Sequence, residues 1–154
     1  MTETTETNEA TVTTETTETV NSGTDPRTGL TVLHRRYVPY AHAHYGGNLV
    51  DGAYLLGMFG DLATELCIRT DGDEGLFASY RDVQFLAPVQ AGDVVEAEAV
   101  VTRVGTRSRE LRLEARIVCR ATATQGAAVS AAVVLDPPVV AVTAVGVVVV
   151  PASA

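Results

Sequence analysis

Lysine and tryptophan are absent from this 154-residue sequence, and cysteine occurs only twice. Without lysine the chain cannot form a Schiff base with a carbonyl substrate or supply the lysine of a phosphate-binding P-loop. Cys67 and Cys119 stand apart, with no CxxC or Cys/His grouping that would hold zinc. We therefore expect two buried, reduced thiols in a cytoplasmic protein that has no metal and no cofactor of its own.

Other common signatures are missing too. The sequence contains neither GxGxxG, the signal for a dinucleotide site, nor GxSxG, the signal for a nucleophilic serine. Positive charge is scarce, because the net charge is -8 and the pI is about 4.7. We expect no binding to nucleic acid or to an anionic membrane surface.

Residues 1–27 differ in composition from the rest. They are mostly threonine and glutamate with few apolar side chains, so they cannot bury enough surface to become ordered. The segment lacks the basic and apolar regions of a signal peptide and is too acidic for a transit peptide. We expect a disordered acidic tail, followed by a single domain over residues 28–154.

The segment 41–69 dominates the remaining sequence. At about 100° per residue, one narrow stripe of a helix would carry three carboxylates together with a tyrosine and a methionine, namely Asp51, Tyr54, Met58, Asp61 and Glu65. A neighbouring stripe would be made only of small residues, namely Ala53, Gly57, Gly60 and Thr64. The spacing predicts one long, buried helix whose small stripe packs closely against a sheet. The carboxylates argue against a transmembrane span.

Strands are predicted on both sides of this helix, at 31–38, 76–86, 93–104, 110–121 and 139–150. Alternation is clear at 111–120, where Leu111, Leu113, Ala115, Ile117 and Cys119 share one face. Residues 71–75 (DGDEG) are read as a solvated turn, and residues 125–138 as a loose connection. The last strand is so apolar that we expect it inside a sheet or against a partner subunit. The order predicts an α+β fold, an antiparallel sheet of five to six strands wrapped around one long central helix.

Three motifs resemble those of a known family: AHYGGNLVDGA at 43–53, GDLATEL at 60–66 and DGDEGLF at 71–77. In this order and spacing they are similar to the beta-alanyl-CoA and 3-aminobutyryl-CoA ammonia-lyases, which have the hot-dog fold. FLAPVQAGDVVEAEAVV at 85–101 is similar to a passage common in hot-dog thioesterases and dehydratases. The family motif has an aspartate before Ala-His-Tyr, where this chain has His42, and this departure bears on the base, the amine and the activity.

The resemblance implies a CoA-thioester enzyme that eliminates ammonia from a 3-aminoacyl-CoA, or adds an amine to a 2-enoyl-CoA. It also implies a homodimer or larger homo-oligomer with active sites between subunits. Such an elimination needs a base for the α-proton, donors for the enolate oxygen and a group that handles the leaving amine. We predict the donors among the N–H groups at the start of the helix, around Gly46, Gly47 and Asn48. Alternatively, the glycines only form a tight turn.

Candidates for proton transfer lie in the loop before the helix and on the helix itself. Histidine titrates near neutral pH, so His42 and His44 suit this role unless they only bond to backbone. Tyr45 would donate to a carbonyl or pack as an aromatic ring. Asp51 would take the α-proton, hold the substrate ammonium or simply stabilise the helix start.

Two further carboxylates and two arginines complete the predicted site. If Asp61 and Glu65 are buried, they must meet arginines, a partner subunit or a cationic substrate. Arg107 and Arg109, in a turn between strands, would bind CoA phosphates or form a solvated basic hairpin.

Three alternative functions stay open from the sequence alone. In an acyl-CoA thioesterase, His42 or Asp51 would activate water. A 2-enoyl-CoA hydratase would use similar chemistry with water in place of ammonia. A non-enzymatic acyl-CoA-binding protein would have lost the chemistry together with the aspartate replaced by His42. In each case the ligand is an acyl thioester of CoA or of an acyl carrier protein.

Overall fold

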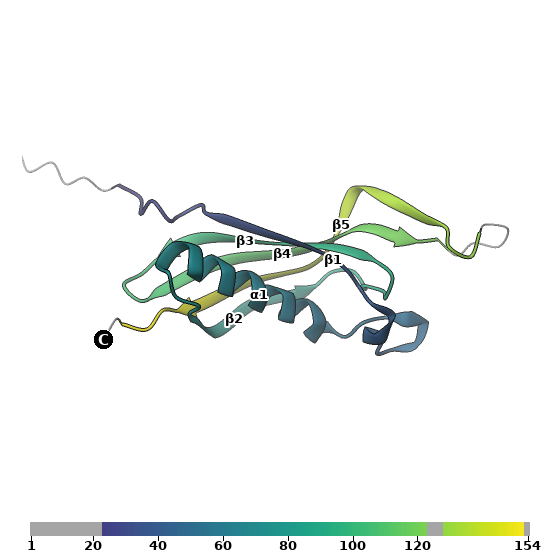
Figure 1. The fold of residues 1–154 in the computed structure, drawn as a ribbon, viewed down its shortest axis with the longest axis horizontal. Coiled ribbons are helices and arrows are strands. Elements are labelled where there is room, and N and C mark those ends of the chain that lie inside the picture. The colour runs from purple at the N-terminus through teal and green to yellow at the C-terminus, as the bar shows by residue number, and fades with distance from the viewer. Residues whose placement is uncertain (1–22, 123–127, 153–154) are drawn as a thin grey trace, which may run out of the picture.

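The computed structural model describes residues 23–122 and 128–152. Within them, antiparallel strands form a five-stranded sheet in the order β1-β3-β4-β5-β2, and helix α1 lies along one face of it (Figure 1). The helix spans Gly52–Asp71, and the strands are β1 Thr31–Tyr37, β2 Leu76–Phe85, β3 Val94–Val104, β4 Ser108–Ala121 and β5 Ala132–Val149. The predicted fold class, a hot-dog arrangement of one sheet around one helix, is confirmed.

The core lies between α1 and the face of the sheet that the helix covers. Its largest fully buried helix side chains are Met58, Phe59, Leu62 and Leu66. Alternate residues of β3 and β4 point into this core, which confirms the alternation predicted for Leu111, Leu113, Ala115 and Ile117. The opposite face of these strands is polar, and arginines of β4 pair there with glutamates of β3 and β4.

The last strand begins earlier than predicted. β5 starts at Ala132, so the expected loose connection is wrong over residues 132–138, while residues 123–127 lie outside the described part of the chain. Its first residues pair with the end of β4 and extend the hairpin beyond the rest of the sheet (Figure 1). Pro137 and Pro138 lie where the pairing with β4 shifts register, so their missing N–H groups break no regular ladder. As predicted, β5 lies inside the sheet, between β4 and β2.

The helix starts later than predicted, because the residues around Gly47 and Asn48, where its start was expected, form a separate 3-10 turn, Gly46–Asn48. Another 3-10 turn, Tyr40–His42, lies before it, and α1 starts only after Asp51. The small stripe does not pack against the sheet: Ala53 and Gly57 are exposed, and a Cβ added at Gly57 or Gly60 would meet nothing within 4 Å. The helix is therefore buried on one side only, and its small residues face outward.

A buried ion pair fixes the end of α1. The Arg109 guanidinium donates to both carboxylate oxygens of Asp71, the last helical residue, and to the carbonyls of Gly105 and Ser108. Arg27 donates to the same carboxylate, which ties the start of the domain to the helix end. Arg109 holds the pKa of Asp71 below its usual range. Asp71 is thus not part of a solvated turn, although Gly72, Asp73 and Glu74 are exposed as predicted.

Most of the predicted disordered tail lies outside the described residues, because the structure begins at residue 23. Of its last residues, Asp25 accepts from Arg27, which is held at the helix end. Both cysteines are free: Cys67 is buried, which raises the pKa of its thiol to about 11, and Cys119 is half-buried. Among the described residues, no helix is both long and apolar enough to cross a membrane.

Arg109→Ala should destabilise the domain by about 3 kcal/mol, because the largely buried Asp71 carboxylate loses the two hydrogen bonds from Arg109 and two carbonyls lose their donor. Urea unfolding followed by circular dichroism would measure the change. Arg103→Ala, at an exposed position of neighbouring β3, is the matched control and should change stability by less than about 0.5 kcal/mol. Equal effects of the two variants would contradict a structural role for Arg109.

Candidate active site

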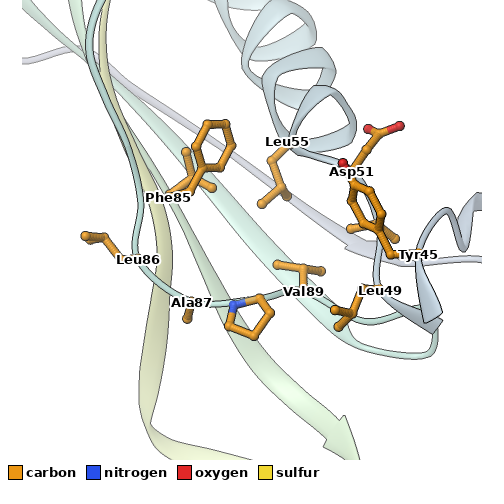
Figure 2. A pocket seen from close by; sticks show the side chains of 12 residues that line it. Tyr45, Leu49, Asp51, Leu55, Phe85, Leu86, Ala87 and Val89 are labelled. Carbon is orange, nitrogen blue, oxygen red and sulfur yellow. The ribbon is translucent and has the colours of Figure 1, made fainter. Parts of the chain in front are cut away.

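An apolar cavity of about 490 Å³ lies beside the first turn of α1 (Figure 2). One wall comes from the start of the helix and the loop before it, the other from the end of β2 and the turn that follows. Most of its lining is aliphatic or aromatic, and Asp51 is its one acidic group: Tyr45, Leu49, Val50, Asp51, Gly52, Leu55, Phe85, Leu86, Ala87, Pro88, Val89 and Val142. A cavity of this size and polarity suits an acyl chain.

The loop before the helix is fixed by backbone hydrogen bonds rather than by helical ones. The N–H groups of His44 and Tyr45 donate to the carbonyl of Leu49, at 2.8 and 2.9 Å. Gly47 and Asn48 have φ values of 72° and 60°, so they form a left-handed turn. Gly46, Gly47 and Asn48 line neither of the cavities described in this section. Predicting oxyanion donors there at a helix start was wrong, because the helix begins four residues later.

The true helix start faces the cavity. Asp51 is the N-cap of α1, and its Oδ1 accepts from the N–H of Tyr54 at 3.0 Å. The next residue, Gly52, lines the cavity at the positive end of the helix dipole, where its N–H lacks a partner within the helix. A Cβ at Gly52 would come within 2.7 Å of the Phe85 ring. Glycine therefore lets the aromatic wall approach the helix start, and Gly52 is a lining residue that the sequence analysis did not name.

The opposite wall is braced by a second buried ion pair, which the sequence analysis also missed. Asp93, only 1% exposed, accepts from the Arg120 guanidinium at 3.0 and 2.7 Å and from the N–H of Gln90. Arg120 also donates to the carbonyl of Pro88 at 2.8 Å. This bonding raises the pKa of Arg120 and holds the Pro88–Val89 wall against β4.

A second hollow, the polar recess, lies on the other side of Asp51. It measures about 400 Å³ and is lined by Arg36, His42, Asp51, Ala53, Tyr54, Gly57 and Asp61. Asp61 is exposed and accepts a hydrogen bond from Arg36 at 2.9 Å. An arginine was one of the three kinds of partner predicted for this carboxylate. The His42 ring packs 4.9 Å from the Tyr54 ring. Asp51 alone lines both hollows.

The other predicted residues divide between this region and the far end of the helix. His44 Nδ1 lies 3.9 Å from Asp51 Oδ2, and the His44 ring packs edge-on against Tyr45, which lines the apolar cavity. Glu65 lines neither hollow. It accepts hydrogen bonds from His34 at 2.6 Å and from Arg69 at 2.7 Å. Both bonds lower the pKa of Glu65, and the bond from His34 has the larger effect.

The two hairpin arginines are separated from the cavity by the length of α1. At about 1.5 Å per residue, this helix is about 30 Å long. Arg109 is 3% exposed and bonded to Asp71, so the prediction that it binds CoA phosphates is wrong for this chain. Arg107 is exposed at the same end and donates weakly to the Val150 carbonyl, at 3.4 Å. Across the described part of the chain, no cluster of three or more His, Cys, Asp or Glu side chains could hold a metal ion.

Comparisons with known proteins agree with this geometry. Residues 47–124 match the Thioesterase superfamily. A 3-aminobutyryl-CoA ammonia lyase from Acetoanaerobium sticklandii is 52% identical over 111 residues, which are 71% of this chain and 85% of that protein. The solved structure of beta-alanyl-CoA:ammonia lyase from Clostridium propionicum is 36% identical, with a TM-score of 0.75 over 80% of this chain and 86% of that one. A hexameric thioesterase from Yersinia pestis, 19% identical, shares the fold with a TM-score of 0.63 over 81% and 89% of the two chains.

Gly52→Ala should weaken binding of butyryl-CoA about tenfold, because the new methyl group displaces the Phe85 ring into the apolar cavity. Isothermal titration calorimetry would measure it. Gly60→Ala is the matched control on the same helix: its methyl group meets nothing, so binding should stay unchanged while helix propensity raises stability by about 0.5–1 kcal/mol. Unchanged binding by Gly52→Ala would contradict the assignment of the cavity.

Proposed function

This chain belongs to the Thioesterase superfamily and, within it, to the acyl-CoA ammonia-lyases, and from that membership we propose that it reversibly eliminates ammonia from a 3-aminoacyl-CoA to give a 2-enoyl-CoA. It is a carbon-nitrogen lyase that acts on CoA thioesters. The observation that carries the proposal is the 52% identity to a 3-aminobutyryl-CoA ammonia lyase over 85% of that protein. The much lower identity to solved thioesterases supports only the shared fold.

The apolar cavity accommodates the acyl chain in this proposal. Its walls of Leu55, Phe85 and Val89 exclude water from the reacting carbons. The thioester carbonyl accepts from the Gly52 N–H, where the helix dipole stabilises the negative charge that develops as the α-proton leaves. One such donor contributes about 2.7–4 kcal/mol to transition-state stability in well-studied enzymes.

Asp51 performs the proton transfer. One of its oxygens is held by the Tyr54 N–H, which orients the carboxylate, while the other faces His44 at 3.9 Å. In the elimination direction, the β-amino group of the substrate starts in its ammonium form. Asp51 takes the α-proton, the electron pair forms the α,β double bond, and the β-carbon–nitrogen bond breaks to release neutral ammonia. The released amine takes up that proton from Asp51 and leaves as ammonium, so atoms, charge and oxidation state balance. His44 assists because its imidazole can place a positive charge next to the carboxylate.

We further propose a homo-oligomer built from dimers, with Arg107 serving the active site of a neighbouring subunit. Arg107 lies at the opposite end of α1 from its own chain's cavity, about 30 Å away by helix rise. Its exposed guanidinium has the charge and geometry to bind CoA phosphates. A carrier-protein thioester in place of CoA, the cytoplasmic location and the absence of a cofactor stay predictions.

Incubation of the protein with crotonyl-CoA and ammonium should yield an acyl-CoA heavier by one ammonia, detected by mass spectrometry. Asp51→Asn should lower the rate at least about a hundredfold, since a positioned base contributes about 10²–10⁴ in rate. Asp73→Asn, in the exposed turn after α1, is the matched control and should react like the native protein.

Release of free CoA without an amine adduct would contradict the lyase proposal in favour of a thioesterase, and a gain of water would favour a hydratase. Binding of crotonyl-CoA without any turnover would favour the non-enzymatic alternative. An Asp51→Asn variant with native activity would leave the lyase assignment in place and would contradict the role given to Asp51.

A further inference from the structure

The polar recess has no task in the elimination of ammonia itself, yet it is large. Ammonia has one heavy atom and needs about the volume of a water molecule, roughly 30 Å³ in the liquid. The recess measures about 400 Å³, and Gly57 leaves open space on its helix side. A site that served only ammonia would not need this volume.

The lining of the recess is suited to a polar ligand. Besides Asp51, the recess is lined by four residues with polar side chains and by Ala53 and Gly57, the four being Arg36, His42, Tyr54 and Asp61. Arg36 donates one N–H to Asp61 and has others left, since a guanidinium carries five. The hydrogen bond to Asp61 raises the pKa of Arg36, so the guanidinium stays charged. An acceptor group on a ligand would find donors here.

Tyr54 is the unusual member of this lining. Its phenolic oxygen is buried and makes no hydrogen bond within the described residues, although the neighbouring Arg36 lies close enough for the phenol to help raise the pKa of Arg36. Leaving a buried hydroxyl unpartnered costs about 1–3 kcal/mol. A ligand in the recess would supply the missing partner.

The recess meets the reacting atoms at Asp51. The carboxylate lines both hollows, so a group bound in the recess lies across Asp51 from the acyl chain in the apolar cavity. A nucleophile held there can lose its proton to the same carboxylate that serves the α-carbon. Two hollows that share one base suit a reaction between two separately bound substrates.

We propose that the polar recess binds the amine substrate, and that this amine is a small primary amine carrying a hydroxyl or a similar hydrogen-bonding group. The inference rests on the proposed function and names its amine. Tyr54 and Arg36 are the positioning residues that bind the polar substituent, and His42 lines the recess beside Tyr54.

The reaction balances without any further reagent. The ammonium form of the amine gives one proton to Asp51, and its nitrogen lone pair forms a bond to the β-carbon of the enoyl thioester. The α,β π-electrons move to the thioester oxygen, where the Gly52 N–H stabilises them. Asp51 then returns the proton to the α-carbon, which gives an N-substituted 3-aminoacyl-CoA with no change in oxidation state.

Ethanolamine and propylamine test the proposal, because they have the same number of heavy atoms and ethanolamine carries a hydroxyl group where propylamine has a methyl group. With crotonyl-CoA, the native protein should form the ethanolamine adduct with a kcat/KM at least about tenfold higher than for propylamine. Tyr54→Phe should raise the KM for ethanolamine about three- to tenfold, the value of one hydrogen bond, without changing the KM for crotonyl-CoA. Arg36→Gln should act likewise, whereas Arg35→Gln should have no effect, because Arg35 pairs with Glu96 instead.

Several outcomes would overturn the proposal. An ammonium adduct without any ethanolamine adduct would contradict it while the lyase assignment stands. Equal kcat/KM for the two amines, or a Tyr54→Phe variant that changes only the KM for crotonyl-CoA, would also contradict it. Absence of adducts with all three amines, ammonium included, would instead contradict the proposed function.

Discussion

The hydrogen bond from the Tyr54 N–H to the Asp51 carboxylate determines the site. It caps α1 at Asp51, so the first free N–H of the helix belongs to Gly52, a residue that lines the apolar cavity. It also orients the carboxylate on the ridge between the apolar cavity and the polar recess. If the helix began one turn earlier, its positive end would lie in the exposed loop, and neither hollow would contain a donor beside a base.

The rest of the fold holds this helix start in place. The sheet buries one side of α1, and the Asp71–Arg109 pair fixes the opposite end. The Asp93–Arg120 pair holds the wall that faces Gly52. Both ion pairs are built from residues that the sheet brings together, so a small domain with a thin core still presents a rigid site. The outward face of α1 carries small residues and leaves the polar recess open.

The sequence alone predicted the fold class and most strand positions, because hydrophobic alternation and burial depend on local spacing, as in β4. The helix start was predicted around Gly47, about one turn too early, because the left-handed conformation of Gly47 and Asn48 does not follow from the side-chain spacing. The N-cap signal, Asp-Gly-Ala, was present in the sequence, and Asp51 is the N-cap of α1. The pairs Arg36–Asp61, His34–Glu65 and Asp71–Arg109 could not be predicted, because their members lie 25 to 38 residues apart along the chain.

The most direct test of this account is a crystal structure of the protein with bound butyryl-CoA, a saturated thioester that cannot eliminate. The account predicts the thioester carbonyl oxygen within hydrogen-bond distance of the Gly52 N–H, the acyl chain against Phe85 and Val89, and the α-carbon next to the Asp51 carboxylate. A carbonyl bound instead by the Gly46–Asn48 turn, or an acyl chain outside the apolar cavity, would contradict the claim that the two hollows meet at the reacting carbons.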